Sequence, residues 1–197
     1  MSTLFETVSR RYAAGLGAVH PYRFTDPRTE SIESFIPAAV LIAMTEREEP
    51  GMLLLHRPSS MRAHPGQVAF PGGRIDTGET AIEAALREAN EELGIDPQCV
   101  RVIGTGDLYR TGSGYEITPV LAVVPADIAI RPNPAEVSQW FEAPVNFVLD
   151  PANQVPRTVE WEGQNREYVE IRWQGHRIWG VTGAIITHLA HRLNWHD

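Results

Sequence analysis

Three glutamates with helical spacing are the residues of this chain best suited to do chemistry. Glu91 and Glu92 follow Glu88 by three and four positions, so on a helix with about 100° per residue the three side chains share an arc of roughly 100°. Like charges at these spacings repel each other by a few tenths of a kcal/mol per pair. The arrangement therefore favours a cation against the helix, and clustered carboxylate oxygens suit a hard divalent ion such as Mg²⁺ or Mn²⁺.

The helix that carries these glutamates is expected to run from about Thr80 to Leu93. Gly94 is well placed to end it, and Gly72-Gly73 ahead of it allow a tight turn that brings backbone groups close to a ligand or metal. An arc of apolar residues next to the glutamates predicts the face that is buried. These apolar residues are Ile82, Ala85, Leu86, Ala89 and Leu93.

Two further charged residues flank the glutamates, and each has two interpretations. Glu79 lies at the start of the expected helix, where the helix dipole favours a carboxylate; alternatively, it pairs with Arg87 and orients the metal-binding face. Arg87 also has Glu83 four positions before it, so a plain surface ion pair is the competing interpretation. The residues alone leave these alternatives open.

The segment from Gly73 to Ile95 resembles the Nudix box, G-x5-E-x7-R-E-U-x-E-E-x-G-U, where U is an apolar residue. Every fixed position is filled, and the one unusual residue is Ala89, which is small where a bulkier aliphatic is common. The resemblance implies an α/β (α+β) fold with a mixed β-sheet sandwiched between helices. It also implies an enzyme that hydrolyses a nucleoside diphosphate linked to another group, with Mg²⁺ or Mn²⁺ as cofactor.

The same resemblance implies roles for the residues of the box. Glu88 and Glu92 would be the principal metal ligands, and Gly73 would bring its backbone to the metal. Glu91 would be a third ligand or the base that activates water, a point on which the family varies. The candidate catalytic residues are therefore Glu79, Arg87, Glu88, Glu91 and Glu92.

The segment before the box narrows the substrate class. From Leu53 to Gly73 it is similar to the signature of the coenzyme A pyrophosphatase branch of the family, loosely L-L-T-x-R-S-x-x-L-R-x-H-x-G-x-V-x-F-P-G-G. The chain departs from this signature at His56 in place of Thr, Pro58 in place of Ser and Met61 in place of Leu, and none of these departures removes a charge. The resemblance implies cleavage of the diphosphate bond of coenzyme A, or of a derivative, to 3′,5′-ADP and 4′-phosphopantetheine or its acyl form.

Coenzyme A carries a 3′-phosphate as well as its diphosphate, so a protein that binds it should supply additional cationic groups. Arg57, Arg62 and His64 lie close in sequence to the expected turn and are candidates for this role. Gly72 and Arg74 are candidate substrate contacts at the turn itself. The competing interpretations are surface charges for the arginines and a loop residue that holds a backbone carbonyl for His64.

Later residues add weaker hypotheses. Glu136 would be a distal carboxylate near the metal or, alternatively, a solvated loop residue. The large aromatic residues are expected mostly in the core or in interfaces, and one of them could stack on adenine. They include Trp140, Phe141, Trp161, Trp173 and Trp179.

Two other functions stay open at this point. The first is another Nudix activity, on ADP-ribose, NADH or a nucleoside triphosphate, since all such enzymes share the box. The second is a Nudix-like module that binds a nucleotide or a partner protein without catalysis. Modules of that kind typically lose box glutamates, and here all of them are present.

Apolar patterning predicts the elements that position the glutamate helix. Pro71-Gly72-Gly73 is expected to break the third strand, and residues 130–136 are expected to form a loop. Strands are expected at 38–44, 52–55, 67–70, 100–108, 117–124, 169–173 and 176–179, and helices at about 4–15, 80–93 and 182–193. Interleaved strands and helices favour one α/β domain over residues 1–197, with an N-terminal helix and lead-in at 1–35 and a core at 36–197.

Composition excludes several classes of protein. A net charge of −8 without any lysine argues against sequence-independent binding of nucleic acid. The sequence has no apolar run near the ~18 residues that span a bilayer. Cys99 is the only cysteine, so no intramolecular disulfide can form, and a reducing cytoplasm is the expected location. The sequence is compatible with a homodimer.

Overall fold

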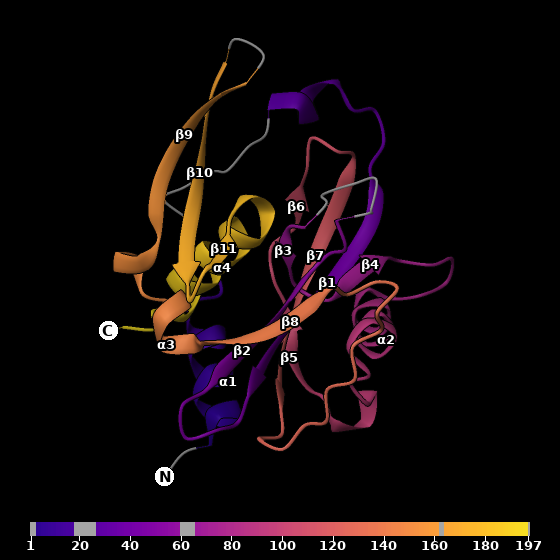
Figure 1. The fold of residues 1–197 in the computed structure, drawn as a ribbon, viewed down its shortest axis with the longest axis vertical. Coiled ribbons are helices and arrows are strands. Elements are labelled where there is room, and N and C mark those ends of the chain that lie inside the picture. The colour runs from indigo at the N-terminus through magenta and orange to yellow at the C-terminus, as the bar shows by residue number, and fades with distance from the viewer. Residues whose placement is uncertain (1–2, 18–26, 60–65, 162–163, 197) are drawn as a thin grey trace.

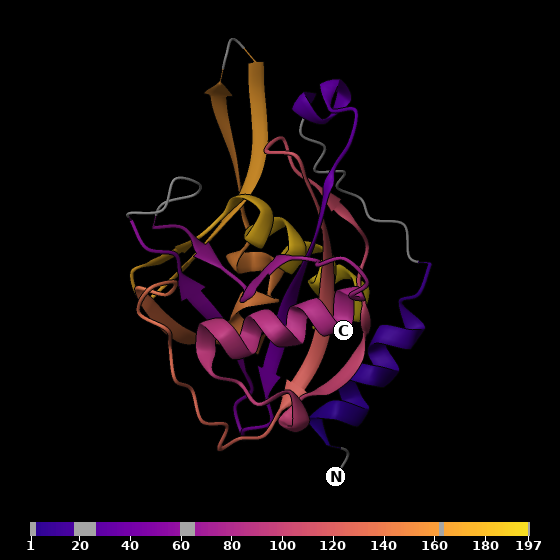
Figure 2. The same ribbon diagram turned by 90° about the vertical axis from the view of Figure 1, so that its right-hand side faces the viewer.

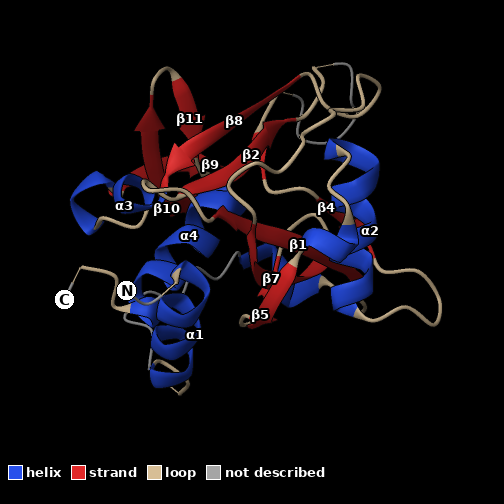
Figure 3. Cartoon of the chain, turned by 90° about the horizontal axis from the view of Figure 1, so that it is seen from below, coloured by secondary structure: helices blue, strands red, loops and turns tan. Residues whose placement is uncertain are grey.

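A mixed β-sheet with helices on both faces forms the centre of the protein (Figure 1). The computed structural model describes residues 3–17, 27–59, 66–161 and 164–196. The helices are α1 (Leu4–Ala14), α2 (Ala81–Leu93), α3 (Val145–Val148) and α4 (Gly180–Leu193). Seen from below, α2 lies on one side of the strands and α1 and α4 lie on the other (Figure 3).

The central sheet is built around two long parallel strands, β1 (Ile36–Thr45) and β7 (Tyr115–Val124). The other pairings are antiparallel. Strands run in the order β3-β2-β1-β7-β5, while β4 pairs with β1, β6 with β7 and β8 with β2. The remaining bounds are β2 (Gly51–His56), β3 (Val68–Ala69), β4 (Gly72–Arg74), β5 (Arg101–Thr105), β6 (Tyr109–Arg110) and β8 (Gln139–Pro144).

Strand β1 is apolar on both faces because both are covered. Successive side chains of a strand point to opposite faces. Ala39, Leu41 and Ala43 accordingly belong to the core that includes α2, whereas Ile42 and Met44 belong to the core that includes α1 and α4. A strand buried on both faces reads as a continuous apolar run, as this one does.

A smaller antiparallel sheet consists of β9 (Val155–Trp161), β10 (Gln164–Trp173) and β11 (His176–Ile178). Strands β9 and β10 project from the body of the protein as a two-stranded ribbon (Figures 1 and 2). Helix α4 packs on β10, and β11 lies next to β3. This second sheet therefore brings C-terminal residues to the end of β2.

The structure confirms the predicted helices at α1, α2 and α4 and the predicted strands at β1, β2, β3, β5, β7, β10 and β11. Pro71-Gly72-Gly73 was expected to break the third strand, and β3 does end at Ala69. The sequence did not predict that the chain returns to the sheet at once, as β4 paired with β1. A side chain at Gly72 would collide with the carbonyl oxygen of Ala39, so glycine permits this close pairing. The strand expected at 100–108 already ends at Thr105, and β8, β9 and α3 were not predicted.

Among the described residues, no helix combines the length and the apolar character that crossing a bilayer requires.

Candidate active site

Local capping residues at both ends determine where α2 begins and ends. The Thr80 hydroxyl accepts a hydrogen bond from the Glu83 backbone N–H at 3.2 Å, and the Glu83 carboxylate accepts one from the Thr80 backbone N–H at 2.8 Å. This reciprocal capping box satisfies two N–H groups at the start of the helix. Gly94 ends the helix in the left-handed conformation, with φ of 67°. Fully buried alanines on its inner face allow close packing on the sheet; they are Ala84, Ala85 and Ala89.

Glu92 is a buried carboxylate that faces the strand before the helix. Only 5% of Glu92 is exposed, and its Oε2 accepts a hydrogen bond from the Gly72 backbone N–H at 2.9 Å. Burial raises the pKa of Glu92 to about 8, and the nearby charges of Glu88 and Glu136 act in the same direction. Folding thus places a carboxylate where its charged form is disfavoured.

Glu88 lies one helical turn earlier, against β4. A side chain at Gly73 would collide with the Glu88 carboxylate, so glycine there allows the strand and the carboxylate to touch. Burial raises the pKa of Glu88, and a hydrogen bond from Arg87 opposes that shift. Glu88 and Glu92 therefore form a pair of adjacent carboxylates beside the Gly72-Gly73 strand.

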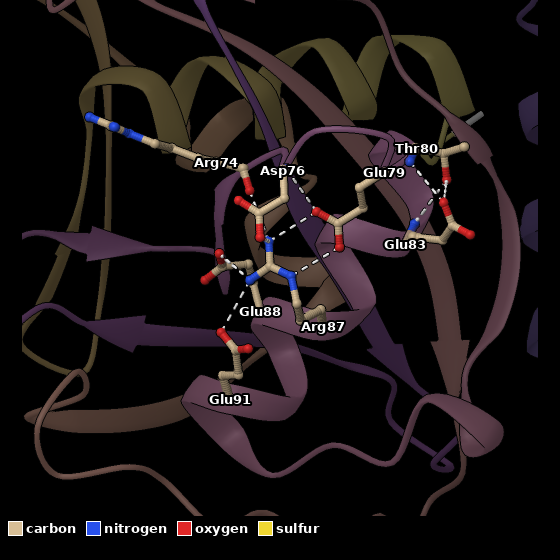
Figure 4. Close-up of polar contacts among 8 residues, drawn as sticks. All are labelled: Arg74, Asp76, Glu79, Thr80, Glu83, Arg87, Glu88 and Glu91. Atoms are coloured by element: carbon tan, nitrogen blue, oxygen red, sulfur yellow. Dashed lines mark hydrogen bonds and ion pairs between the residues drawn. The ribbon is translucent and has the colours of Figure 1, made fainter.

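The guanidinium of Arg87 ties the surrounding acidic residues together (Figure 4). It donates to both carboxylate oxygens of Glu79, at 2.9 and 3.1 Å. It also donates to Glu88 at 2.8 Å, to Glu91 at 3.1 Å and to the backbone carbonyl oxygen of Arg74 at 2.9 Å. The hydrogen bonds to Glu79 and Glu88 raise the pKa of Arg87. A single planar donor thereby fixes three carboxylates and the end of β4.

These contacts decide between the two partners considered for Arg87. Glu79 is the partner, and the Arg87 hydrogen bond lowers the pKa of Glu79, while Glu83 is engaged in the helix cap. Arg74 joins the site through its backbone only. Its side chain extends away from the carboxylates (Figure 4) and donates to the Tyr115 hydroxyl at 3.3 Å.

Glu136 and Arg57, from two other segments, place charges near Glu92. Asn133 donates its backbone N–H to the Glu92 carbonyl oxygen at 2.9 Å and its side-chain amide to Glu136 at 3.2 Å. Glu136 is held close enough that its charge adds to the raised pKa of Glu88 and of Glu92. The charge of Arg57 acts oppositely on Glu92, and within the described residues the buried Nε of Arg57 has no hydrogen-bond partner.

The structure thus gathers most of the predicted site residues at the junction of β4 and α2. Arg62 and His64 lie outside the described residues. Sequence reasoning missed Asn133 and Asp76, whose backbone N–H donates to Glu79 at 3.0 Å. Asn133 lies in the loop expected at 130–136, but a local turn signal does not show which side chains that loop contacts.

A divalent metal ion fits this donor set. No three Asp, Glu, His or Cys side chains converge into a ready-made cage within the described part of the chain, and Glu91 is turned toward Arg87. Mg²⁺, however, usually binds through one or two carboxylates together with waters and substrate phosphates. Glu88 and Glu92 supply two such oxygen donors, and a cation between them would relieve the effects that raise their pKa values.

The raised pKa of Glu92 predicts how stability depends on pH. In the presence of a chelator, the free energy of unfolding should fall as pH rises from the ordinary carboxyl pKa of 4.5 to about 8. The folded state holds this proton more tightly than the unfolded chain, so deprotonation opposes folding across that interval. Saturating Mg²⁺ should reverse the trend, because the ion binds the deprotonated carboxylate.

Urea unfolding across this pH range checks the prediction, with Glu92→Gln as the matched control. The variant cannot lose a proton at this position, so its curve should be flatter than that of the wild type. Parallel curves for the two proteins would contradict the assignment of the slope to Glu92.

The sequence of the chain matches a known protein family. The NUDIX domain family matches residues 35–166. The uncharacterized Nudix hydrolase NudL of Enterobacter sp. (strain 638) is 42% identical over 155 residues, which cover 78% of this chain and 80% of the relative. NudL of Escherichia coli (strain K12) is 41% identical over 154 residues, with the same shares covered.

A solved structure supports the fold independently of the sequence. DR0079 from Deinococcus radiodurans superimposes with a TM-score of 0.54 and is 15% identical, covering 85% of this chain and 90% of its own. At that identity the likeness shows the fold alone. The predicted fold class, a mixed sheet with helices on both sides, is confirmed.

Proposed function

This chain belongs to the Nudix hydrolases, a family of pyrophosphohydrolases that generally use a divalent metal, and from that premise we propose that it cleaves the diphosphate of coenzyme A or a derivative with Mg²⁺ or Mn²⁺. The environment of Arg57 is the observation that supports this proposal. It belongs to the segment that resembles the coenzyme A branch, its charge acts on Glu92, and its buried Nε has no partner among the described residues. A phosphate oxygen would be a strong acceptor for that donor.

The chain's own residues account for most of the chemistry. Glu88 and Glu92 would hold the ion, which when bound would supply positive charge against the diphosphate and make water a better nucleophile. Arg57 binds and orients a phosphate oxygen, and Glu91 is a candidate to accept the proton of the attacking water. Water adds to one phosphorus and the bridging P–O bond breaks, which gives 3′,5′-ADP and 4′-phosphopantetheine.

Arg62 and His64 are proposed to contact the 3′-phosphate, the group that distinguishes coenzyme A from other nucleotide diphosphates. Cationic side chains suit this role because each phosphate adds negative charge and strong acceptor oxygens. We also propose a cytoplasmic location, where this substrate would be met under reducing conditions.

The expected result of a substrate panel is brisk hydrolysis of coenzyme A and slower hydrolysis of dephospho-coenzyme A, which lacks only the 3′-phosphate. The loss of one charged contact is expected to raise KM roughly tenfold or more. Products are identified by chromatography and mass spectrometry, with ADP-ribose, NADH and nucleoside triphosphates tested in parallel. Turnover of ADP-ribose without turnover of coenzyme A would refute the proposed substrate while leaving the family assignment intact.

A further inference from the structure

Two histidines far apart in the sequence form an imidazole pair at the end of β2. His56 Nε2 lies 2.9 Å from His176 Nδ1. The ring of His176 is stacked on Phe141, with 3.7 Å between ring centroids and an angle of 3° between planes. Phe141 is buried in the core, so this aromatic contact holds the His176 ring in place. The other ring nitrogen of His56 faces the carbonyl oxygen of Gly66, in the segment that follows β2.

The hydrogen-bond partners assign a direction to the pair. His56 Nδ1 lies 3.3 Å from the carbonyl oxygen of Gly66, and a carbonyl can only accept, so Nδ1 carries a hydrogen. In neutral His56 the other nitrogen is then an acceptor, and His176 donates to it. Two hydrogen bonds therefore run in series from His176 through His56 to Gly66.

Gly66 connects this series to the backbone of Arg57. The Gly66 N–H donates to the Arg57 carbonyl oxygen at 3.1 Å, and the Arg57 N–H donates to the Gln67 carbonyl oxygen at 3.0 Å. These bonds close the stem of the segment 57–67. On the other side, Ser138 donates its backbone N–H to the His56 carbonyl oxygen at 3.0 Å. The backbone that carries Arg57 is thus fixed from both flanks.

We propose that His56, held by His176, is a positioning residue that fixes Arg57 for contact with the substrate diphosphate. The inference rests on the proposed function, because it takes from there the role of Arg57. A small displacement of a group that positions the substrate can be costly. The hydrogen bonds that fix the backbone of Arg57 would therefore serve to keep its guanidinium in place.

The pair has few charged neighbours among the described residues. His176 has a lowered pKa because it is buried and because His56 lies beside it. The sequence neighbour Arg177 points its charge to Glu170, and the charge of Arg57 acts on Glu92. The neighbouring β3 carries no charged residue.

Two amide substitutions at His56 distinguish its contact with Gly66 from its contact with His176. His56→Asn keeps a donor near the position of Nδ1, which faces Gly66, and His56→Gln keeps one near Nε2 instead. With the diphosphate that the wild type hydrolyses, His56→Gln should raise KM roughly three- to tenfold, the size of one lost hydrogen bond, with little change in kcat. His56→Asn, which keeps the donor that faces Gly66, should give a smaller rise in KM than His56→Gln.

A second measurement needs no substrate. Hydrogen exchange at the Arg57 and Gly66 amides should speed up in His56→Gln and stay close to wild type in His56→Asn. His191→Gln, an exposed histidine of α4, serves as the control and should change neither readout. If coenzyme A is not a substrate, the proposed function fails, but the exchange measurement still stands.

The inference would be overturned if His56→Gln and His56→Asn behaved alike in both measurements. It would equally be overturned if His56→Gln lowered the melting temperature while KM and amide exchange stayed at the wild-type values, since that result describes a purely structural role.

Discussion

Glu92→Gln is expected to lower kcat for the diphosphate substrate by at least about a thousand-fold, the factor that corresponds to roughly 4 kcal/mol of lost charge stabilisation. Glutamine fills the same volume and keeps an oxygen for the Gly72 N–H, which now bonds Glu92 Oε2 at 2.9 Å. It also resembles the protonated form that burial favours in the absence of a cation. The variant should therefore fold normally and fail only in metal binding and catalysis.

The matched control for this prediction is Glu83→Gln on the same helix. Glu83 caps α2 through Thr80, and glutamine can serve the same capping role. Steady-state kinetics with saturating Mn²⁺ should show near wild-type kcat for Glu83→Gln. Comparable losses in the two variants, or an active Glu92→Gln, would remove Glu92 from the metal site.

The parts of the site that could be predicted are those governed by local rules. Helix α2 has an N-cap, an apolar arc and a terminal glycine in one continuous segment, and each acts over a few residues. The same local rules could also have identified the partner of Arg87. Thr80 and Glu83 form an S/T-x-x-E capping box, which already indicated that Glu83 serves the helix start and that Glu79 is free to pair with Arg87.

The parts that could not be predicted depend on residues that are far apart in the sequence. Strand β4 has no apolar alternation, and its identity comes from pairing with β1. Glu136 comes near the glutamate pair only because Asn133 bonds the end of α2. The two histidines of the pair are separated by 120 positions, so no periodicity within a window reveals them.

Arg87→Lys is expected to lower kcat/KM roughly 10- to 100-fold, the usual cost of losing a group that orients metal ligands. The guanidinium reaches Glu79, Glu88 and Glu91 at once, at distances between 2.8 and 3.1 Å. A lysine ammonium carries its donors on one atom and cannot span these acceptors. Affinity for Mn²⁺, measured by titration, should fall together with kcat/KM because Glu88 is no longer held in place.

A double-mutant cycle between Arg87→Lys and Glu79→Gln tests whether the two residues act as one unit. Either substitution alone breaks the contact between the Arg87 guanidinium and the Glu79 carboxylate. The double variant should therefore lose little more kcat/KM than the more affected single variant. Arg110→Lys is the control, because Arg110 makes an exposed ion pair with Glu116 at 2.8 Å, and such pairs contribute little. Fully additive losses of kcat/KM would mean that Arg87 acts on the glutamates without Glu79, and a wild-type Mn²⁺ affinity in Arg87→Lys would mean that it does not orient them at all.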